Sequence, residues 1–549
     1  MRPIRRSAFG GPVASQSQMA LPELHSQRRR NSVPYMGYRR PDFGRWKTIL
    51  LLLMLVGIAS GVGLAIAMMP TARMSLFAIP IALLAALIIW LLPEGATPPT
   101  RFMQQMFFAY FVAVTIWPYY IAIDIPGFPL IEIRRAFLAL AVLMLTISVS
   151  VSRDFRAELG GIFRASPLFF KFFGAFLIIQ MASLAMAHDY RSAISFFVKD
   201  QLGWTSVLLM AAYIFSRPGT IMTWAATLRT MGIFLACIAF AEYKNEALLW
   251  MDHIPSFLSI SDTELIARNL TPHFRDGQYR VTGPFIVSLS FAEWMALTTP
   301  FFLYYILFGR NLVLKGICLA ADITLLFAVE LTQARIGLVG MLVTHTLFIG
   351  AWALRARTRG GNTLLPTAVL AAYPAIFCAI VVAVLTVDRL RISVLGGGTQ
   401  AASDQGRREQ MLLAIPKIMQ RPLNGYGVGQ APQALGWTNP QGDISLDSYV
   451  ITLLMDYGVI GFACYVGMIA TAAVQGFRLG MSSNSEEGGY ALAAGVTLCA
   501  WMVCQIALSQ EDNASLIFMV LAIVVALAYR RKQAEDTPGY GFQPSAGRR

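Results

Sequence analysis

Residues 406–430 read GRREQMLLAIPKIMQRPLNGYGVGQ, and residues 445–462 read SLDSYVITLLMDYGVIGF. The first segment is basic, contains several glycines and belongs to a hydrophilic stretch that begins near residue 388. The second opens an apolar run that continues to residue 475, which is long enough for a helix to cross the hydrocarbon core of a bilayer. This boundary predicts a membrane-spanning helix preceded by a long polar loop outside the bilayer.

The rest of the chain is dominated by similar apolar segments. Of its 549 residues, 56% are hydrophobic and only 13% are charged, and the mean hydropathy is +0.58. These values exclude an ordinary soluble globular protein. We predict an all-α polytopic membrane protein with about 12 to 14 transmembrane helices, because segments of spanning length recur throughout. They lie near residues 47–69, 74–92, 103–123, 134–152, 168–187, 202–216, 220–243, 288–308, 311–331, 335–355, 364–387, 449–475, 488–508 and 513–529.

The net charge of +14 is concentrated at the two ends of the chain. Residues 1–45 hold nine arginines and two acidic residues (+7), and residues 530–549 hold five basic and two acidic residues (+3). Basic tails beside apolar segments stay on the cytoplasmic side and contact anionic lipid headgroups. We therefore expect both termini to be cytoplasmic, and membrane lipid explains the basic balance without nucleic acid as a partner.

The segmentation predicts five regions. They are a disordered basic cytoplasmic tail (1–45), N-terminal transmembrane helices (46–243), a region with two long outer loops (244–475), C-terminal transmembrane helices (476–530) and a second cytoplasmic tail (531–549). The outer loops span 244–287 and 388–448, so the outer face is expected to be the working face. A smaller outer segment, 188–202, spaces apolar residues between charged ends and predicts a short amphipathic helix at the interface, either structural or substrate-guiding.

No metal or other cofactor is indicated. All six cysteines lie in apolar segments without a Cys-Xaa-Xaa-Cys spacing, which favours small hydrophobic residues over a disulfide framework or a zinc site. Asp404, Glu409 and Asp443 do not have the spacing of a calcium or magnesium loop.

Arginines stand in three separate outer elements. Arg280 lies just ahead of a membrane helix, Arg335 opens another, and Arg407 and Arg408 belong to the long polar loop. Planar guanidinium groups can bind phosphate through two parallel hydrogen bonds, which Lys cannot do. For Arg335 the alternative is snorkelling at the interface or an ion pair with Glu330.

The order of these motifs resembles the O-antigen ligase/polymerase family of bacterial membrane glycosyltransferases. The resemblance covers roughly residues 280–470, and the earlier helices match only in hydropathy. The matching residues are Arg280 and Gly283, Thr332 and Arg335, Gly406 and Arg407, Pro422, Leu423, Gly425, Gly427 and Gly429, and Tyr457, Gly458 and Gly461.

The resemblance implies transfer of a glycan from undecaprenyl pyrophosphate at the periplasmic side of the bacterial inner membrane. Arg280, Arg335, Arg407 and Arg408 would bind the pyrophosphate, and Arg335 would also take part in catalysis by stabilising the charge that grows on it. Ligases of this family usually carry a histidine just before the helix that starts here at Ser448, whereas this chain has Asp447. We therefore expect a polysaccharide polymerase for exopolysaccharide or O-antigen.

Asp447 and the glycine-rich turn each have two interpretations. Asp447 is either the base that accepts the proton of the acceptor hydroxyl or a helix N-cap. Residues 425–429 either approach phosphate through backbone N–H groups or form a turn that ends a helix over 407–421. Gly396 to Gly398 predict a flexible hinge that admits a bulky glycan.

Two other functions remain open. The first is a ligase that moves finished polymer to lipid A-core, and the second is a polysaccharide flippase or other transporter. A transporter is expected to show charges near the midplane of the membrane, whereas the charges in this sequence cluster at one face. Besides the lipid-linked oligosaccharide donor, a chain-length regulator and a flippase of the same pathway are candidate partners. The activated lipid already supplies the energy for a metal-independent reaction.

Overall fold

A computed structural model describes 53, 87–90, 92, 94, 97–98, 100–124, 131–260, 271–272, 274–275, 277–359, 364–388, 391, 401–439, 442, 444–483, 485–509 and 511–536. The chain divides into two compact units, Met1–Pro98 with Val149–Gly160, and Pro99–Ser148 with Gly161–Arg549. In the first unit, Glu94 forms ion pairs with Arg153 and Arg156. The expected spans near 47–69 and 74–92 lie almost entirely outside the described residues.

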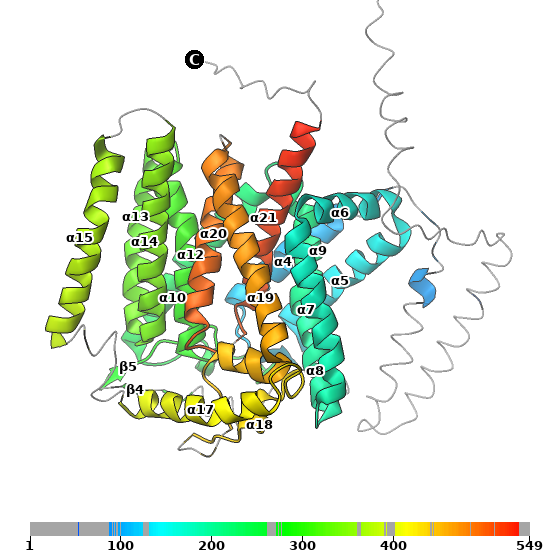
Figure 1. Cartoon of the computed structure of the whole chain (residues 1–549), viewed down its shortest axis with the longest axis horizontal. Helices are drawn as coiled ribbons and strands as arrows, with labels where there is room; N and C mark the ends of the chain where they lie inside the picture. The colour runs from blue at the N-terminus through cyan, green and yellow to red at the C-terminus, as the bar shows by residue number, and fades with distance from the viewer. Residues whose placement is uncertain are drawn as a thin grey trace, which may run out of the picture. The chain divides into compact units, whose positions relative to one another are not determined.

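Helices dominate the described residues (Figure 1). They are α4 (Thr100–Ile116), α5 (Ile133–Val151), α6 (Arg153–Ala165), α7 (Pro167–Ser183), α8 (Tyr190–Asp200), α9 (Ser206–Phe215), α10 (Thr220–Asn245), α12 (Ser288–Phe308), α13 (Leu312–Leu331), α14 (Arg335–Thr358), α15 (Leu364–Thr386), α17 (Ala401–Gln420), α18 (Ala431–Leu435), α19 (Tyr449–Ser482), α20 (Glu486–Cys504) and α21 (Ala514–Glu535). The strands are β1 (Ile121–Ile123), β2 (Ile131–Glu132), β3 (Leu258–Ile260), β4 (Phe274–Arg275) and β5 (Gln278–Tyr279).

Ten helices of the described part are long and apolar enough to span a membrane. The chain is therefore an all-α polytopic membrane protein, as the composition predicted. The ten are α5, α7, α10, α12, α13, α14, α15, α19, α20 and α21, with the span that begins in α7 extending to Met186. Two other predicted spans are shorter helices: α4 ends at Ile116, just before Trp117 and Pro118, and α9 begins only at Ser206.

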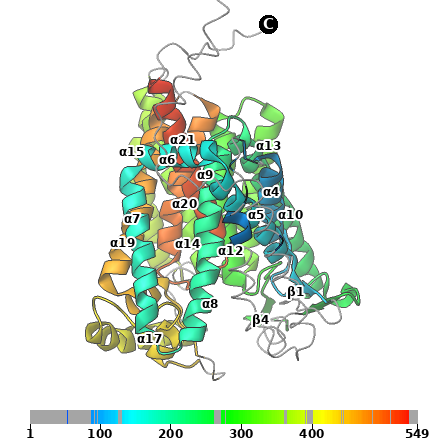
Figure 2. The same cartoon turned by 90° about the vertical axis from the view of Figure 1, so that its right-hand side faces the viewer.

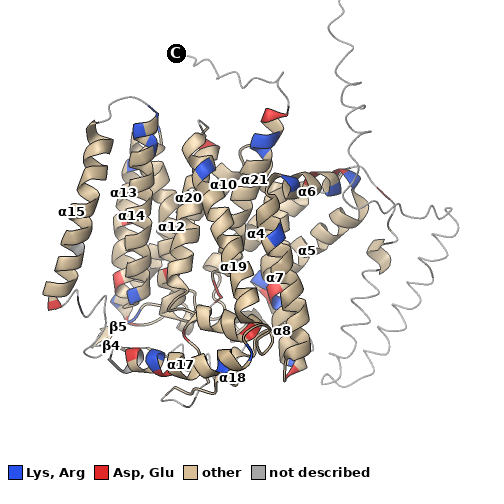
Figure 3. Ribbon diagram, in the orientation of Figure 1, with Lys and Arg blue, Asp and Glu red and all other residues tan. Residues whose placement is uncertain are grey.

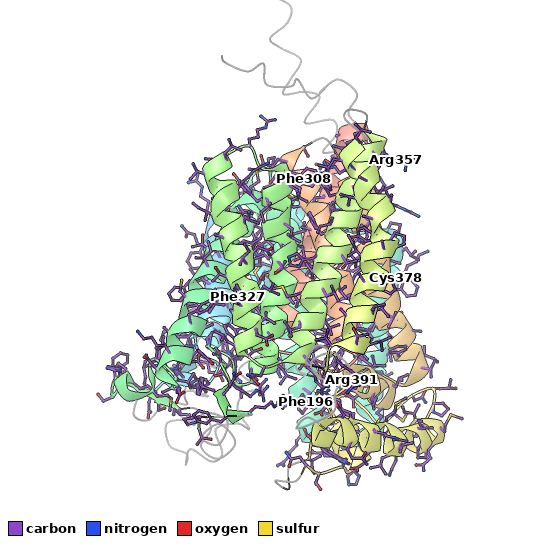
Figure 4. All side chains as sticks on the ribbon, turned by 90° about the vertical axis from the view of Figure 1, so that its left-hand side faces the viewer. Phe196, Phe308, Phe327, Arg357, Cys378 and Arg391 are labelled. Atoms are coloured by element: carbon purple, nitrogen blue, oxygen red, sulfur yellow. The ribbon has the colours of Figure 1, made fainter. Side chains whose placement is uncertain are left out.

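The second unit is built around α12, α20 and α21, whose side chains are mostly buried (Figure 1). Small residues allow close packing there. A Cβ atom at Gly476 of α19 would approach the Ala491 carbonyl oxygen of α20 to 2.8 Å, so the two helices can cross at this distance only with glycine. Large apolar side chains instead cover the outer surfaces, including Phe377 of α15 and Phe327 of α13 (Figure 4). That distribution suits a bundle surrounded by lipid acyl chains.

Segment 188–202 forms a short helix, α8, as its sequence predicted, but this helix does not end at the segment's C-terminal boundary. Asp189 caps α8 by accepting hydrogen bonds from the N–H groups of Arg191 and Ser192. A π-helical turn, Gln201–Thr205, then continues directly into α9 with helical backbone angles (Figure 2). The amphipathic segment is thus an extension of a longer helix, because no residue between Asp200 and Ser206 breaks the helical backbone.

The two expected outer loops contain regular structure. Within 244–287, β4 forms an antiparallel hairpin with β5. β3 pairs with β1, a strand earlier in the chain that also pairs with β2. In 388–448, α17 and α18 lie across one end of the bundle (Figure 1), which we call the α17 end. Ala414 of α17 packs with Ala431 and Leu435 of α18 and with Met455 of α19. A predominantly polar loop is held at the bundle by this small apolar cluster.

Candidate active site

A pocket of about 430 Å³ lies at the α17 end. Its walls come from the loop before α12, the turn between α13 and α14, the N-terminal part of α17, the residue before Ser448 and the segment after α20. The lining residues are Arg275, Arg280, Val287, Leu289, Gln333, Ala334, Arg335, Ile336, Val339, Asp404, Arg407, Asp447, Ala507, Leu508 and Ser509.

The pocket brings together four of the five residues that the sequence singled out. Arg280, Arg335, Arg407 and Asp447 all line it, although they are up to 167 residues apart in the chain. Arg408 does not line it, because this side chain is exposed on α17. Consecutive residues on a helix point about 100° apart, so with Arg407 facing the pocket Arg408 points away from it.

Arg335 opens α14 and forms an ion pair across the pocket with Asp404 of α17. Its Nη2 donates to Asp404 Oδ1 at 2.5 Å and its Nη1 donates to Oδ2 at 3.3 Å. The alternative partner considered from the sequence, Glu330, is replaced by a residue of the long loop. This bidentate pair uses two of the five N–H groups of the guanidinium, so three remain for another ligand.

Arg280 is held by the turn between α13 and α14. Its Nε donates to the Thr332 carbonyl oxygen at 3.2 Å, and Arg275 donates to the next carbonyl, that of Gln333, at 3.4 Å. Gln333 has a positive φ of 55°, a conformation that non-glycine residues rarely adopt. Burial and the neighbouring Arg275 lower the pKa of Arg280 to about 10, which leaves its guanidinium charged at neutral pH.

Arg407 lies between two carboxylates. Its Nη1 is 4.0 Å from Asp404 Oδ1, and its Nε is 3.8 Å from Asp447 Oδ2. Both distances exceed that of a hydrogen bond. The Arg407 Nε atom is buried and has no hydrogen-bond acceptor within the described part of the chain. A buried guanidinium nitrogen without an acceptor is a natural contact for an anionic ligand.

Asp447 is not the N-cap of α19. Ser448 occupies that position, and the Asp447 backbone N–H donates to Gln410 Oε1 at 2.9 Å. Burial raises the pKa of Asp447, and Arg407 opposes that shift. A carboxylate with a raised pKa that lines a pocket is suited to accept a proton. The capping alternative is therefore wrong, and the role as a base stays a prediction.

The glycine-rich turn does not offer its N–H groups to phosphate. Asp456 of α19 accepts hydrogen bonds from Gly429, Gln430 and Ala431 at 2.9, 3.0 and 2.7 Å. The turn follows α17, as the alternative interpretation predicted, and fits against a kink at Gly458, where φ is 68°. A Cβ atom at Gly458 would come within 2.3 Å of the Leu423 carbonyl oxygen, so this contact requires glycine.

Sequence reasoning missed three buried carboxylates at this end of the bundle. Glu242, Glu293 and Asp456 stand inside apolar segments but bind polar groups of the loops at the α17 end. An acidic residue within a spanning segment is a recognised signal of a functional or positioning role, and it was available in the sequence.

The structure brings no candidate metal ligands together: no group of three or more His, Cys, Asp or Glu side chains in the described ranges could hold a metal ion. The six cysteines are free thiols. Asp443 and the predicted hinge at Gly396 to Gly398 lie outside the described residues.

Comparison with known protein families provides independent evidence on the part of the chain that contributes most of the candidate site. Residues 319–466 match the family model of the O-antigen ligases. The matched region includes Arg335, Asp404, Arg407 and Asp447, whereas Arg280 precedes it. No curated protein matches the chain. This match supports a membrane enzyme of O-antigen or polysaccharide assembly, and the resemblance inferred from the short motifs is confirmed.

Proposed function

We propose that the protein is a membrane glycosyltransferase that polymerises oligosaccharide repeats carried on undecaprenyl pyrophosphate. The observation that carries the proposal is the pocket at the α17 end, which is lined by four arginines and two aspartates among the described residues and includes residues of the region that matches the O-antigen ligases. The excess of positive charge matches a pyrophosphate, whose oxygens accept forked hydrogen bonds from guanidinium groups.

The proposed reaction transfers a glycan from its lipid pyrophosphate to a sugar hydroxyl. The acceptor oxygen attacks the anomeric carbon, Asp447 takes the hydroxyl proton, and the bond from that carbon to the pyrophosphate oxygen breaks with its electron pair left on the pyrophosphate. Arg280, Arg335 and Arg407 would stabilise this developing charge, and each well-placed donor contributes roughly 3 kcal/mol. The lipid pyrophosphate supplies the driving force.

We also propose that the α17 end faces the periplasm and that the membrane is the bacterial inner membrane. Arg357, in the last turn of α14, lies at the opposite end of the bundle from α17 (Figure 4), and Figure 3 shows basic residues at that end of α14 and α21. Basic loop residues favour the cytoplasmic side. Fusions of a periplasm-active reporter near residues 260 and 430 should be active, and fusions near 160, 357 and 484 should be silent. A silent fusion near 430 contradicts this orientation.

The decisive test of the function is the glycolipid that accumulates when the gene is deleted. A polymerase acts after each repeat unit has been made and flipped, so its loss should leave single lipid-linked repeat units. Full-length polymer on the undecaprenyl carrier, without transfer to lipid A, would instead identify the ligase and overturn the polymerase proposal. The domain match is compatible with both enzymes, and Asp447 at the position where ligases usually carry histidine favours the polymerase.

One observation favours a transporter. His345 of α14 binds Asp322 of α13 through Nε2 at 3.0 Å, well inside two spanning helices. Charges are thus not confined to one face, contrary to the sequence-based argument against transport. Intramembrane ionisable pairs occur in transporters, so a flippase remains the second candidate. Accumulation of unflipped lipid-linked repeats in the deletion strain would support it.

A further inference from the structure

We propose that Glu242 is a positioning residue for Arg280 and thereby for recognition of the anionic substrate group. This inference rests on the proposed pyrophosphate-binding role of the pocket. Glu242 lies near the end of α10, is fully buried and does not line the pocket. It therefore acts on the pocket only through the residues that it holds.

The carboxylate of Glu242 binds the chain on both sides of Arg280. Oε1 accepts hydrogen bonds from the Tyr279 hydroxyl at 3.1 Å and from the Thr282 backbone N–H at 2.9 Å. Oε2 accepts one from the Gly283 backbone N–H at 2.9 Å. Two successive N–H groups converge on one carboxylate because Gly283 has a φ of 56°, a conformation that glycine adopts without steric cost.

The remaining contacts of this segment fix it to the turn between α13 and α14. The Val281 N–H donates to the Leu331 carbonyl at 3.2 Å, and Arg280 Nε donates to that of Thr332 at the same distance. Glu242 and this turn together define where the Arg280 main chain lies. Because Nε is hydrogen-bonded to Thr332, the terminal nitrogens of Arg280 are the ones left to contact a ligand in the pocket that this side chain lines.

A carboxylate is better suited to this task than an amide. Ionised Glu offers two acceptor oxygens, whereas Gln offers one and places an NH₂ donor where the second N–H group is already a donor. Bonds from backbone N–H groups to a carboxylate are also stronger than neutral ones. Glu242→Gln should therefore keep the size of the side chain but release part of the loop.

The chain provides a matched control at the opposite end of the bundle. Glu487 is also buried, and it accepts hydrogen bonds from the Gly219 backbone N–H at 2.7 Å and from Arg530 at 2.7 Å. Glu487→Gln disrupts the same kind of contact far from the pocket. Its effect reports the general cost of weakening a buried carboxylate.

The test titrates inorganic pyrophosphate into the full-length protein in detergent, for the wild type, Glu242→Gln, Arg280→Lys, the double variant and Glu487→Gln. Glu242→Gln should weaken pyrophosphate affinity by about 5- to 30-fold, which corresponds to about 1 to 2 kcal/mol. In the Arg280→Lys background the same change should weaken it by less than about 2-fold, because interacting sites are not additive. Glu487→Gln should bind like the wild type.

Each alternative result has a distinct meaning. Wild-type affinity in folded Glu242→Gln, or equal losses with and without Arg280, overturns the positioning role. No binding of pyrophosphate by the wild type overturns the proposed pocket function and this inference together.

If Glu242→Gln does not fold, Tyr279→Phe removes only one donor to the same carboxylate. It should weaken affinity by about 2- to 5-fold, in line with one hydrogen bond, and only when Arg280 is present; wild-type affinity in Tyr279→Phe would overturn the role.

Discussion

Two walls of the same pocket differ in their charge. The loop before α12 contributes Arg275 and Arg280, which we call the basic wall, and α17 with the residue before Ser448 contributes Asp404, Arg407 and Asp447, the mixed wall. Arg335 faces the mixed wall through its pair with Asp404. Cations alone can bind an anion, but proton transfer needs a carboxylate as well. The difference therefore suggests that one wall binds charge and the other also performs chemistry.

The largest expected effect on polymer formation comes from substitution of Arg335, which lines the pocket and is paired with Asp404 of the mixed wall. Arg335→Lys keeps the charge but loses the planar fork that binds Asp404 and, in our proposal, pyrophosphate. Polymer formation should fall by about 100- to 1,000-fold, as for loss of a transition-state donor. The measurement is polymer yield in cells at matched protein level.

Arg391→Lys is the control for that variant. Arg391 is half-exposed and pairs with Asp388 one helical turn earlier, a type of pair that contributes about 0 to 1 kcal/mol. It should retain nearly full activity. Wild-type polymer from Arg335→Lys would leave Arg335 with a structural or interfacial role.

The second prediction tests the mixed wall. Asp447→Asn removes the proton acceptor while leaving the backbone bond to Gln410 and the cap at Ser448 in place. We expect a loss of about 100-fold in polymerisation rate, the lower end for general base catalysis, with unchanged thermal stability. A stable variant that makes polymer at the wild-type rate would remove Asp447 from the mechanism.

The sequence predicts the charged residues that lie within recognisable motifs. It does not predict the charged residues that the tertiary structure places beside those motifs. Arg280 and Arg335 follow from their places beside apolar segments, Arg407 from its place in the long polar loop, and all three from the chemistry of phosphate. The sequence offers Asp404 only as a candidate metal ligand, and its spacing does not fit a calcium or magnesium loop. Its bond to Arg335 depends on how α17 folds back over the bundle, which spacing along the chain cannot show.

The fold shows the same limit. Hydropathy located most spanning helices, because lipid imposes a length and composition on each of them. It does not show that α8 continues into α9, and it leaves two interpretations of the glycine-rich turn open, because the outcome there depends on partners elsewhere in the chain. Asp456 binds the turn's N–H groups, and Phe196 of α8 lies so close to Gly429 that a Cβ atom there would approach its ring to 2.5 Å.

The third prediction concerns pH. Asp447 accepts a proton only when ionised, so activity should fall as pH decreases through its pKa. Burial raises that pKa and Arg407 opposes the shift, which places the acidic limb above the range of an exposed aspartate. Arg407→Gln removes the opposing charge and should move the midpoint to higher pH, whatever its effect on the maximum rate. Rates of polymer formation in isolated membranes across pH test this, and a midpoint that stays or moves lower contradicts it.

The smallest effect is expected from Arg408, next to Arg407 on α17. The two residues were predicted together to bind pyrophosphate, yet only Arg407 lines the pocket, and Arg408 is exposed on another face of the helix. Because an exposed charge is screened and contributes about 0 to 1 kcal/mol, Arg408→Gln should change polymer yield by about 2-fold or less. Arg407→Gln in the same assay should reduce it far more, since it removes a donor from the mixed wall. Equal losses from the two variants would mean that α17 turns on binding substrate, so that both arginines reach the pyrophosphate, and the division into two walls would no longer hold.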